Sequence, residues 1–345
     1  MDARNGLCTA GLPIDMSKRA YQPPFTPTSE IISLVARIAE QIGRLSAQAN
    51  YGMDLRLRRI NRIRSITGSL AIEGNSLSEE QITGILEGKT VLAPPRELQE
   101  ARNALAVYEH LSKWKGSSER DLLVAHKQLM RGLLDHPGTY RTSGIGVMAG
   151  TRVVHMAPPA NRVPRLMGQL FDWLKSTREH PLIASSVFHY EFEFIHPFAD
   201  GNGRMGRLWQ TLILSEWQPA FAWLPVESLV HQRQDRYYRA INDSTAASDC
   251  APFVHFMLDR IHDAVSKASG RKTGKAIGKT TGKKPLGTPE AILKLLGKRP
   301  ALTVPELAAE LGKAEITIHR AIRILRESGR LERVGPDKGG KWRVL

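Results

Sequence analysis

The chain has 345 residues, a length that predicts two domains and a smaller third one. Of these residues 41% are hydrophobic and 24% charged, which excludes a disordered or fibrous protein. No segment approaches the roughly 20 consecutive apolar residues of a membrane span, and the N-terminus lacks the apolar core of a signal peptide. The formal net charge is +15, and about +12 of it falls in residues 265–345, which indicates a basic C-terminal module with an anionic partner such as nucleic acid.

Helical periodicity dominates the chain before this basic region. Apolar residues recur every three or four positions, which predicts a mainly α, all-helical main domain. The first helix is expected to start with Ser29 as its N-cap and to bury Ile32 and Ile38 on one stripe. The segments with this pattern are 29–45, 55–72, 96–114, 118–134, 163–176, 181–195, 203–217 and 250–265.

Strand signals are scarce in the same region. The clearest lies in residues 143–159, where glycines and β-branched residues stand between turn formers. This pattern predicts a small β-hairpin, which by itself could be purely structural.

The segment that carries chemistry is HPFADGNGRMGR, residues 196–207. One apolar helix should end at His196 and another should begin at Gly203. The turn between them contains glycines, which let the backbone approach a phosphate closely. Free N–H groups at a helix N-terminus bind anions, so the turn is expected to form a phosphate cradle.

Charged side chains surround this predicted cradle. Arg204 and Arg207 are three residues apart, so both guanidinium groups share one helix face. Asp200 is a hard oxygen ligand placed to hold a phosphate-bound Mg²⁺. His196 is a titratable base at the rim. Together these groups are suited to attack on a nucleoside triphosphate.

Other interpretations of the glycines are weaker. GNGRMG fits the dinucleotide pattern G-x-G-x-x-G, but that pattern requires a preceding strand, and both flanks here resemble helices. Residues 274–280 resemble a P-loop but have one residue too few between the glycines. Metal binding by His189 and His196 stays open, although no H-E-x-x-H motif exists.

Beyond the main domain, residues 266–288 are rich in Gly, Lys, Thr and Ser and predict a basic flexible linker. Three short helices at 288–298, 303–312 and 315–329 then precede two apolar runs around a Gly-rich turn. This order is typical of a winged helix-turn-helix domain.

In the third of these helices, the face opposite the apolar stripe carries Arg320 and Arg323, which we expect to bind DNA. A winged helix that binds protein, and a basic tail that only improves solubility, stay open as alternatives.

Residues 196–207 resemble the signature of Fic-domain proteins, H-x-F-x-[DE]-G-N-G-R-x-x-R, at every defined position. The resemblance covers roughly residues 20–265 and implies the all-helical Fic fold. Most such enzymes transfer AMP from ATP to a hydroxyl side chain of a target protein. His196 would then be the general base for a Ser, Thr or Tyr hydroxyl, and Asp200 would hold Mg²⁺ against the phosphates.

The resemblance also implies which residues contact the nucleotide, with ATP and Mg²⁺ as substrate and cofactor. Gly201, Asn202 and Gly203 would form the anion hole, and Arg207 would meet the γ-phosphate. Residues 145–148 resemble the flap where a target segment would add as a strand. The full expected set is Asp200, Gly201, Asn202, Gly203, Arg204, Met205, Gly206, Arg207, Tyr237, Ile145, Gly146, Val147 and Met148.

Tyr237 resembles the tyrosine that stacks near the nucleotide base in the family. The family often has an asparagine a short distance later, whereas this chain has Thr245. Adenine specificity is therefore less firmly implied than phosphate binding, and transfer of another nucleotide stays open.

Residues 69–75, SLAIEGN, resemble the Fic inhibitory motif [ST]-x-x-x-E-[GN]. Glu73 would pair with Arg207, and an arginine held by a carboxylate cannot receive the γ-phosphate. Ser69 and Gly74 complete the motif, although Gly74 could simply cap a helix. In some relatives the same glutamate also supports removal of AMP from the modified target.

The predicted organisation is a Fic N-terminal region with an inhibitory helix at 1–115, a Fic catalytic core at 116–265, a linker at 266–288 and a winged helix-turn-helix at 289–345. We expect an autoinhibited protein adenylyltransferase; the alternative is a nucleotide-sensing, DNA-binding transcription regulator. Two cysteines, Cys8 and Cys250, are too few for a disulfide framework or a cysteine zinc site, which suits a cytoplasmic protein. No membrane partner is expected. The sequence leaves the target protein and a homodimer open.

Overall fold

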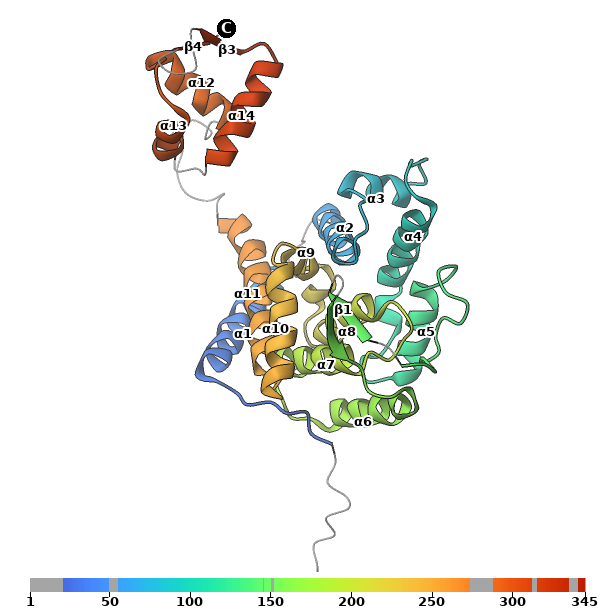
Figure 1. Cartoon of the computed structure of the whole chain (residues 1–345). Coiled ribbons are helices and arrows are strands. Elements are labelled where there is room, and N and C mark those ends of the chain that lie inside the picture. The colour runs from blue at the N-terminus through green and yellow to red at the C-terminus, as the bar shows by residue number, and fades with distance from the viewer. Residues whose placement is uncertain are drawn as a thin grey trace, which may run out of the picture. The chain divides into compact units, whose positions relative to one another are not determined.

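The computed structural model describes residues 21–49, 55–144, 146–149, 152–273, 288–311, 315–334 and 341–344. The chain divides into two compact units, Met1–Lys275 and Ala276–Leu345, and each has its own hydrophobic core. Both units are mainly helical and carry a two-stranded sheet, which confirms the expected fold class (Figure 1). Among the described residues, no helix is long and apolar enough to cross a membrane.

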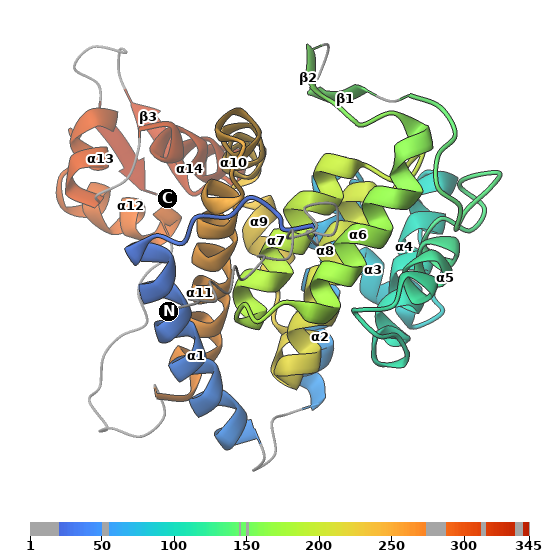
Figure 2. The same cartoon turned by 90° about the horizontal axis from the view of Figure 1, so that it is seen from below.

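Unit 1 is built from α-helices that surround a central pair. Its helices are α1 (Ser29–Ala49), α2 (Leu55–Ile72), α3 (Glu79–Leu86), α4 (Pro95–Glu109), α5 (Glu119–Leu129), α6 (Val163–Ser176), α7 (Pro181–Ile195), α8 (Asn202–Trp217), α9 (Val226–His231), α10 (Gln234–Ala247) and α11 (Ala251–Thr273). Helices α7 and α8 pack on each other and bury most of their side chains, as expected of helices that are apolar on several faces. Figure 2 shows them between α1 and α11 on one side and α4, α5 and α6 on the other.

The start of helix α1 differs from the expectation. Thr28, not Ser29, caps the helix, because the Thr28 hydroxyl accepts the backbone N–H of Ile31 at 3.3 Å. The buried face includes Ile31 and Ile38, whereas Ile32 is 59% exposed. The buried face is thus turned relative to the predicted stripe, because α1 packs on α11 through the face that includes Ile31. Local spacing does not specify which helix will be the packing partner.

Helix α3 was not predicted, although a local signal for it exists. Ser78 accepts the backbone N–H of Gln81, and the Gln81 side chain accepts the Ser78 N–H, which together form a capping box. Only eight residues follow this cap, too few for a strong amphipathic pattern.

Helix α11 also differs from the expectation, since it continues to Thr273. The first part of the predicted linker 266–288 is therefore helical. Val265 is fully buried, and Ser266 donates a hydrogen bond to Gln41 of α1 at 3.0 Å, so packing on α1 supports a segment whose composition favours a coil.

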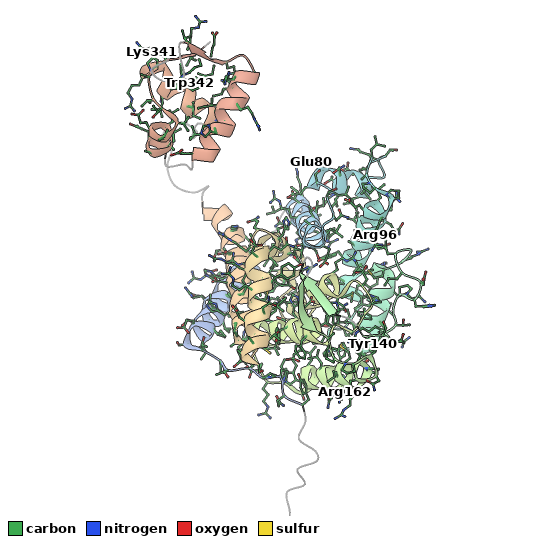
Figure 3. All side chains as sticks on the ribbon, in the orientation of Figure 1. Glu80, Arg96, Tyr140, Arg162, Lys341 and Trp342 are labelled. Atoms are coloured by element: carbon green, nitrogen blue, oxygen red, sulfur yellow. The ribbon has the colours of Figure 1, made fainter. Side chains whose placement is uncertain are left out.

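The predicted hairpin consists of β1 (Gly146–Ala149) and β2 (Arg152–Met156), which pair antiparallel with a register shift between Val147 and Met148. Unit 2 contains α12 (Thr288–Lys298), α13 (Val304–Leu311), α14 (Glu315–Glu327), β3 (Leu331–Val334) and β4 (Lys341–Val344). These three helices and one hairpin confirm the winged helix-turn-helix expectation. Trp342 of β4, labelled in Figure 3, closes the small core of this unit.

Candidate active site

The loop between α7 and α8 contains two residues with positive φ, His196 and Gly201. Helix α7 ends at Ile195 and is followed by His196, which adopts φ 50°, a left-handed conformation that is uncommon for a residue other than glycine. Gly201 has φ 84° and directly precedes α8. A Cβ at Gly201 would lie 2.7 Å from the Met130 sulfur, so backbone conformation and space both require glycine here.

Asn202 closes this loop on itself. Its side-chain oxygen accepts the backbone N–H of Phe198 at 2.9 Å, and its side-chain nitrogen donates to the Phe198 carbonyl at 2.9 Å. Phe198 is fully buried and stacks on His126 with a centroid separation of 3.6 Å. The Asn202 side chain therefore shapes the loop, which leaves only its backbone to face an anion.

His126 of α5 is a support that sequence reasoning missed. Gly138 donates its backbone N–H to Nδ1 at 2.8 Å, so Nε2 carries the proton and donates to the Asp200 carbonyl at 3.0 Å. Burial lowers the pKa of His126 to about 4, and the Arg204 charge acts in the same direction. His126 is therefore neutral at physiological pH and fixes the loop backbone at Asp200.

Arg141 is a second missed support. It is 5% exposed and donates to the carbonyls of His196 at 2.7 Å, Ser143 at 2.8 Å and Pro158 at 2.5 Å. Its own backbone N–H donates to the Pro197 carbonyl at 2.9 Å. A buried arginine whose partners are carbonyl oxygens has no local sequence signature, since the partners come from separate segments.

The start of α8 is the place of the predicted cradle. The first N–H groups of a helix lack intrahelical acceptors and carry partial positive charge. Arg204 is 5% exposed and is held by Glu100 of α4 at 3.3 Å. Its Nε is buried, and no described residue accepts a hydrogen bond from it. An unsatisfied buried donor beside a helix N-terminus favours an anionic ligand.

Arg207, one turn further along α8, is paired with the end of α2. Its Nη2 donates to Glu73 at 2.6 Å and to the Ser69 carbonyl at 3.1 Å, and its Nε donates to the Ser69 hydroxyl at 3.1 Å. Burial alone would lower the pKa of Arg207, but the Glu73 carboxylate raises it above the ordinary value. The ion pair therefore holds the charged guanidinium in one position.

Glu73 also covers the cradle itself. A Cβ at Gly203 would collide with the Glu73 carboxylate oxygen, so this carboxylate lies over the first turn of α8. Helix α2 ends at Ile72, and Gly74 takes φ 90° with its N–H bonded to the Ala71 carbonyl. Gly74 thus terminates the helix that carries Glu73.

Asp200, the predicted metal ligand, is engaged by two arginines. Its Oδ2 lies 3.1 Å from Arg96 Nη2, and its Oδ1 lies 3.4 Å from Arg204 Nη2. Among the described residues, no group of three or more His, Cys, Asp or Glu side chains could hold a metal. A single carboxylate beside an anion cradle fits a Mg²⁺ ion that takes most of its ligands from phosphates and water.

Three of the predicted nucleotide contacts face elsewhere. Met205 is fully buried in the core, and Gly206 faces α7, where a Cβ would lie 2.7 Å from the His189 ring. Tyr237 is 2% exposed and shares a hydrogen bond with His189 at 3.2 Å, so its ring lies in the core. The next residue, Tyr238, is 42% exposed. Motif membership does not state which way a side chain points, so contact of these three residues with the nucleotide stays a prediction.

The remaining predicted residues lie in the hairpin and in unit 2. Gly146, Val147 and Met148 belong to β1, whose backbone pairs with β2, while Ile145 lies outside the described residues. Arg323 is exposed on α14, and Arg320 is on the same helix.

Comparison with known proteins is consistent with this geometry. Residues 116–214 match the Fic/DOC family model, and residues 287–332 match a winged helix-turn-helix DNA-binding model. A solved Fic family protein from Desulfovibrio desulfuricans is 47% identical, with a TM-score of 0.71, over 94% of this chain and 98% of that one. Fic-1 from C. elegans, at 22% identity over 72% of this chain and 73% of that one, shares the fold with a TM-score of 0.58.

Curated relatives are named protein adenylyltransferase Fic. The Nematostella vectensis protein is 28% identical over 203 residues, 55% of this chain and 44% of the relative. The Aedes aegypti protein is 27% identical over 238 residues, 65% of this chain and 45% of the relative. The chain thus spans less than half the length of these two relatives.

Proposed function

The chain belongs to the Fic family, and we propose that it is an autoinhibited protein adenylyltransferase that transfers AMP from ATP to a Ser, Thr or Tyr hydroxyl of a target protein. The observation that carries the proposal is the cradle at the start of α8. There the buried Arg204 Nε has no acceptor among the described residues, and it lies beside the first-turn N–H groups, so an anion such as a phosphate would satisfy these donors. The name of the curated relatives supports the same activity.

In the proposed reaction, His196 accepts the proton of the target hydroxyl. The hydroxyl oxygen then bonds to the α-phosphorus of ATP, the bond from this phosphorus to the bridging oxygen breaks, and pyrophosphate leaves. Arg204 and the first-turn N–H groups of α8 hold the phosphates and stabilise the charge that develops on them. Arg141 fixes the His196 carbonyl and thereby the position of the base.

Asp200 is the residue that would hold Mg²⁺, which when bound supplies charge neutralisation at the phosphates. The loop supports this role, because His126 and the Gly201 N–H fix the Asp200 backbone and carboxylate at the edge of the cradle. Tyr238 is the exposed aromatic residue of α10 and is the better candidate for contact with the base.

We propose that the resting state is inhibited by Glu73. Its carboxylate occupies the space above Gly203 and pairs with Arg207, the group that would receive the γ-phosphate. ATP could then bind only with its α-phosphate misplaced for in-line attack, and a displacement of about 1 Å costs on the order of 10²-fold in rate. With Glu73 at the same place, removal of AMP from a modified target is a second activity of this site.

Unit 2 supplies a second proposal, DNA binding through α14. The family model that it matches is described as DNA-binding, and Arg323 is exposed on the third helix. A nucleotide-sensing transcription regulator would use the same two units without group transfer. His196 favours the transferase, because a sensor has no need of a base at that position.

The test is transfer of label from α-labelled ATP to protein. The Glu73→Gly chain should label itself or an added target, and Glu73→Gly combined with His196→Ala should not. Because the base acts on the target hydroxyl, the combined variant should still bind Mg-ATP with an affinity close to that of Glu73→Gly. No label from Glu73→Gly, with ATP bound and a lysate supplying targets, would favour the regulator.

A further inference from the structure

Arg96 of α4 pairs with Asp200, the residue that would hold Mg²⁺. Its Nη2 lies 3.1 Å from Asp200 Oδ2, although the two residues are 104 positions apart. The other carboxylate oxygen, Oδ1, faces Arg204 and accepts the Gly201 N–H at 2.6 Å. Oδ2 is therefore the oxygen with the fewest protein partners, and Arg96 holds it.

Glu100 positions Arg96 for this contact. Its Oε1 lies 3.4 Å from Arg96 Nε and 3.3 Å from Arg204 Nη1, so the carboxylate bridges the two arginines that meet Asp200. Its Oε2 accepts a hydrogen bond from Asn75 at 3.0 Å. Two carboxylates and two guanidinium groups thus form a closed ring of alternating charge.

The two arginines of this ring differ in their freedom to move. The Arg204 side chain is 5% exposed and lies on α8 beside the cradle, whereas the Arg96 side chain is 60% exposed. Arg96 can turn into solvent with little loss of packing, but Arg204 cannot. Of the two, Arg96 is the one that a competing cation can displace.

We propose that Arg96 is a tethered cation that competes with nucleotide-bound Mg²⁺ for Asp200 and so raises the Mg²⁺ concentration that nucleotide binding requires. This inference rests on the proposed function of the cradle. A guanidinium and a divalent ion cannot both occupy Oδ2, because like charges at such distances repel. Arg96 is exposed, so its pair with Asp200 is weak enough to be displaced, and the expected effect is about three- to fivefold in Mg²⁺ affinity.

The test is the binding of α,β-methylene ATP, which cannot be turned over, to the full chain by isothermal titration calorimetry across a series of Mg²⁺ concentrations. For Arg96→Gln, the Mg²⁺ concentration that gives half of the maximal nucleotide affinity should fall about three- to fivefold. Arg96→Lys keeps the cation and should remain within about twofold of wild type. Arg102→Gln, an exposed arginine of the same helix, is the matched control and should not change it.

Two results would overturn the inference while leaving the proposed function intact. One is an unchanged Mg²⁺ requirement in Arg96→Gln. The other is a loss of nucleotide affinity in Arg96→Gln both with Mg²⁺ and with EDTA, which would make Arg96 a phosphate ligand. Absence of nucleotide binding in all four proteins, wild type included, would overturn the proposed function and this inference together.

Discussion

Arg207 Nη2 donates a 2.6 Å hydrogen bond to the Glu73 carboxylate across 134 residues of chain. Arg207 is 2% exposed, and the end of α2 also supplies the Ser69 hydroxyl and carbonyl to its guanidinium. The end of α2 therefore supplies hydrogen-bond acceptors to the buried Arg207 of α8, and one of them, the Glu73 carboxylate, lies over the cradle.

Release of Arg207 should activate the transferase. Glu73→Gly and Glu73→Ala should both raise labelling of self or target, by up to about 100-fold, because the γ-phosphate can then dock on Arg207 and align the α-phosphate. The alanine variant separates this effect from the roughly 1 kcal/mol that glycine costs near a helix end. Initial rates with α-labelled ATP measure the effect.

The control for this prediction is Glu73→Gly with Arg207→Ala, which should lose the gain because the freed partner is gone. Ser69→Ala removes one bond to Arg207 but keeps Glu73, so it should activate less than Glu73→Ala. Equal, low labelling by wild type and Glu73→Gly, with targets present, contradicts inhibition.

Acid should weaken the fold through His126. Burial lowers its pKa from 6.5 to about 4, so between these values the unfolded chain binds more protons than the folded chain. The stabilisation is fully present above pH 6.5 and is lost as the pH falls toward 4, by roughly 3 kcal/mol in total. Urea unfolding at pH 7 and at pH 5 measures it.

The variant His126→Phe keeps an aromatic ring that can stack on Phe198 but has no imidazole to take up a proton. Its stability should be lower at pH 7, by about 1–3 kcal/mol for the lost hydrogen bonds, and the deficit should shrink at pH 5. His136→Phe, at an exposed position, should follow wild type. Parallel pH profiles of wild type and His126→Phe would exclude this role.

Arg141→Lys should impair both stability and turnover. A lysine ammonium cannot reach the separate carbonyls that the guanidinium joins, so buried acceptors at His196 and Pro158 lose their donor. We expect a loss of about 2–4 kcal/mol and a lower kcat in the Glu73→Gly background. The matched control is Arg162→Lys, which should leave stability and kcat unchanged. Arg162 is exposed just before α6 and is labelled in Figure 3. Wild-type stability of Arg141→Lys would refute the assignment.

DNA binding should depend on unit 2. A chain that ends at Lys275 should retain nucleotide binding and lose salt-sensitive binding to duplex DNA, because the basic residues of the proposed interface are gone. In the full chain, Arg323→Gln should weaken binding and lower the salt slope by about one. Arg62→Gln, at an exposed arginine of unit 1, is the control and should not change it. Fluorescence anisotropy at several salt concentrations measures the DNA affinity and its salt slope. Undiminished DNA binding by the truncated chain would assign this function to unit 1.

Local pattern predicted the elements well where a helix is long and strongly periodic. The expected segments 163–176, 181–195 and 288–298 coincide with α6, α7 and α12. It failed at two helix ends. Thr28 and Ser29 are adjacent residues that can both cap, and the structure uses Thr28. Helix α11 extends to Thr273 because it packs on α1. The local pattern also does not state that the Tyr237 ring is buried, because the same motif is compatible with a buried or an exposed ring.

The sequence by itself indicated the kind of chemistry that we propose, because glycines, arginines, a carboxylate and a histidine stand within residues 196–207. Chain spacing alone places them in one loop and in the first turns of the helix that follows it. Only the tertiary structure decided which groups hold that loop and which occupy it. Arg141, His126 and Arg96 reach it from other segments, and no local spacing records such a meeting, because the angles at which helices pack are set by the whole core.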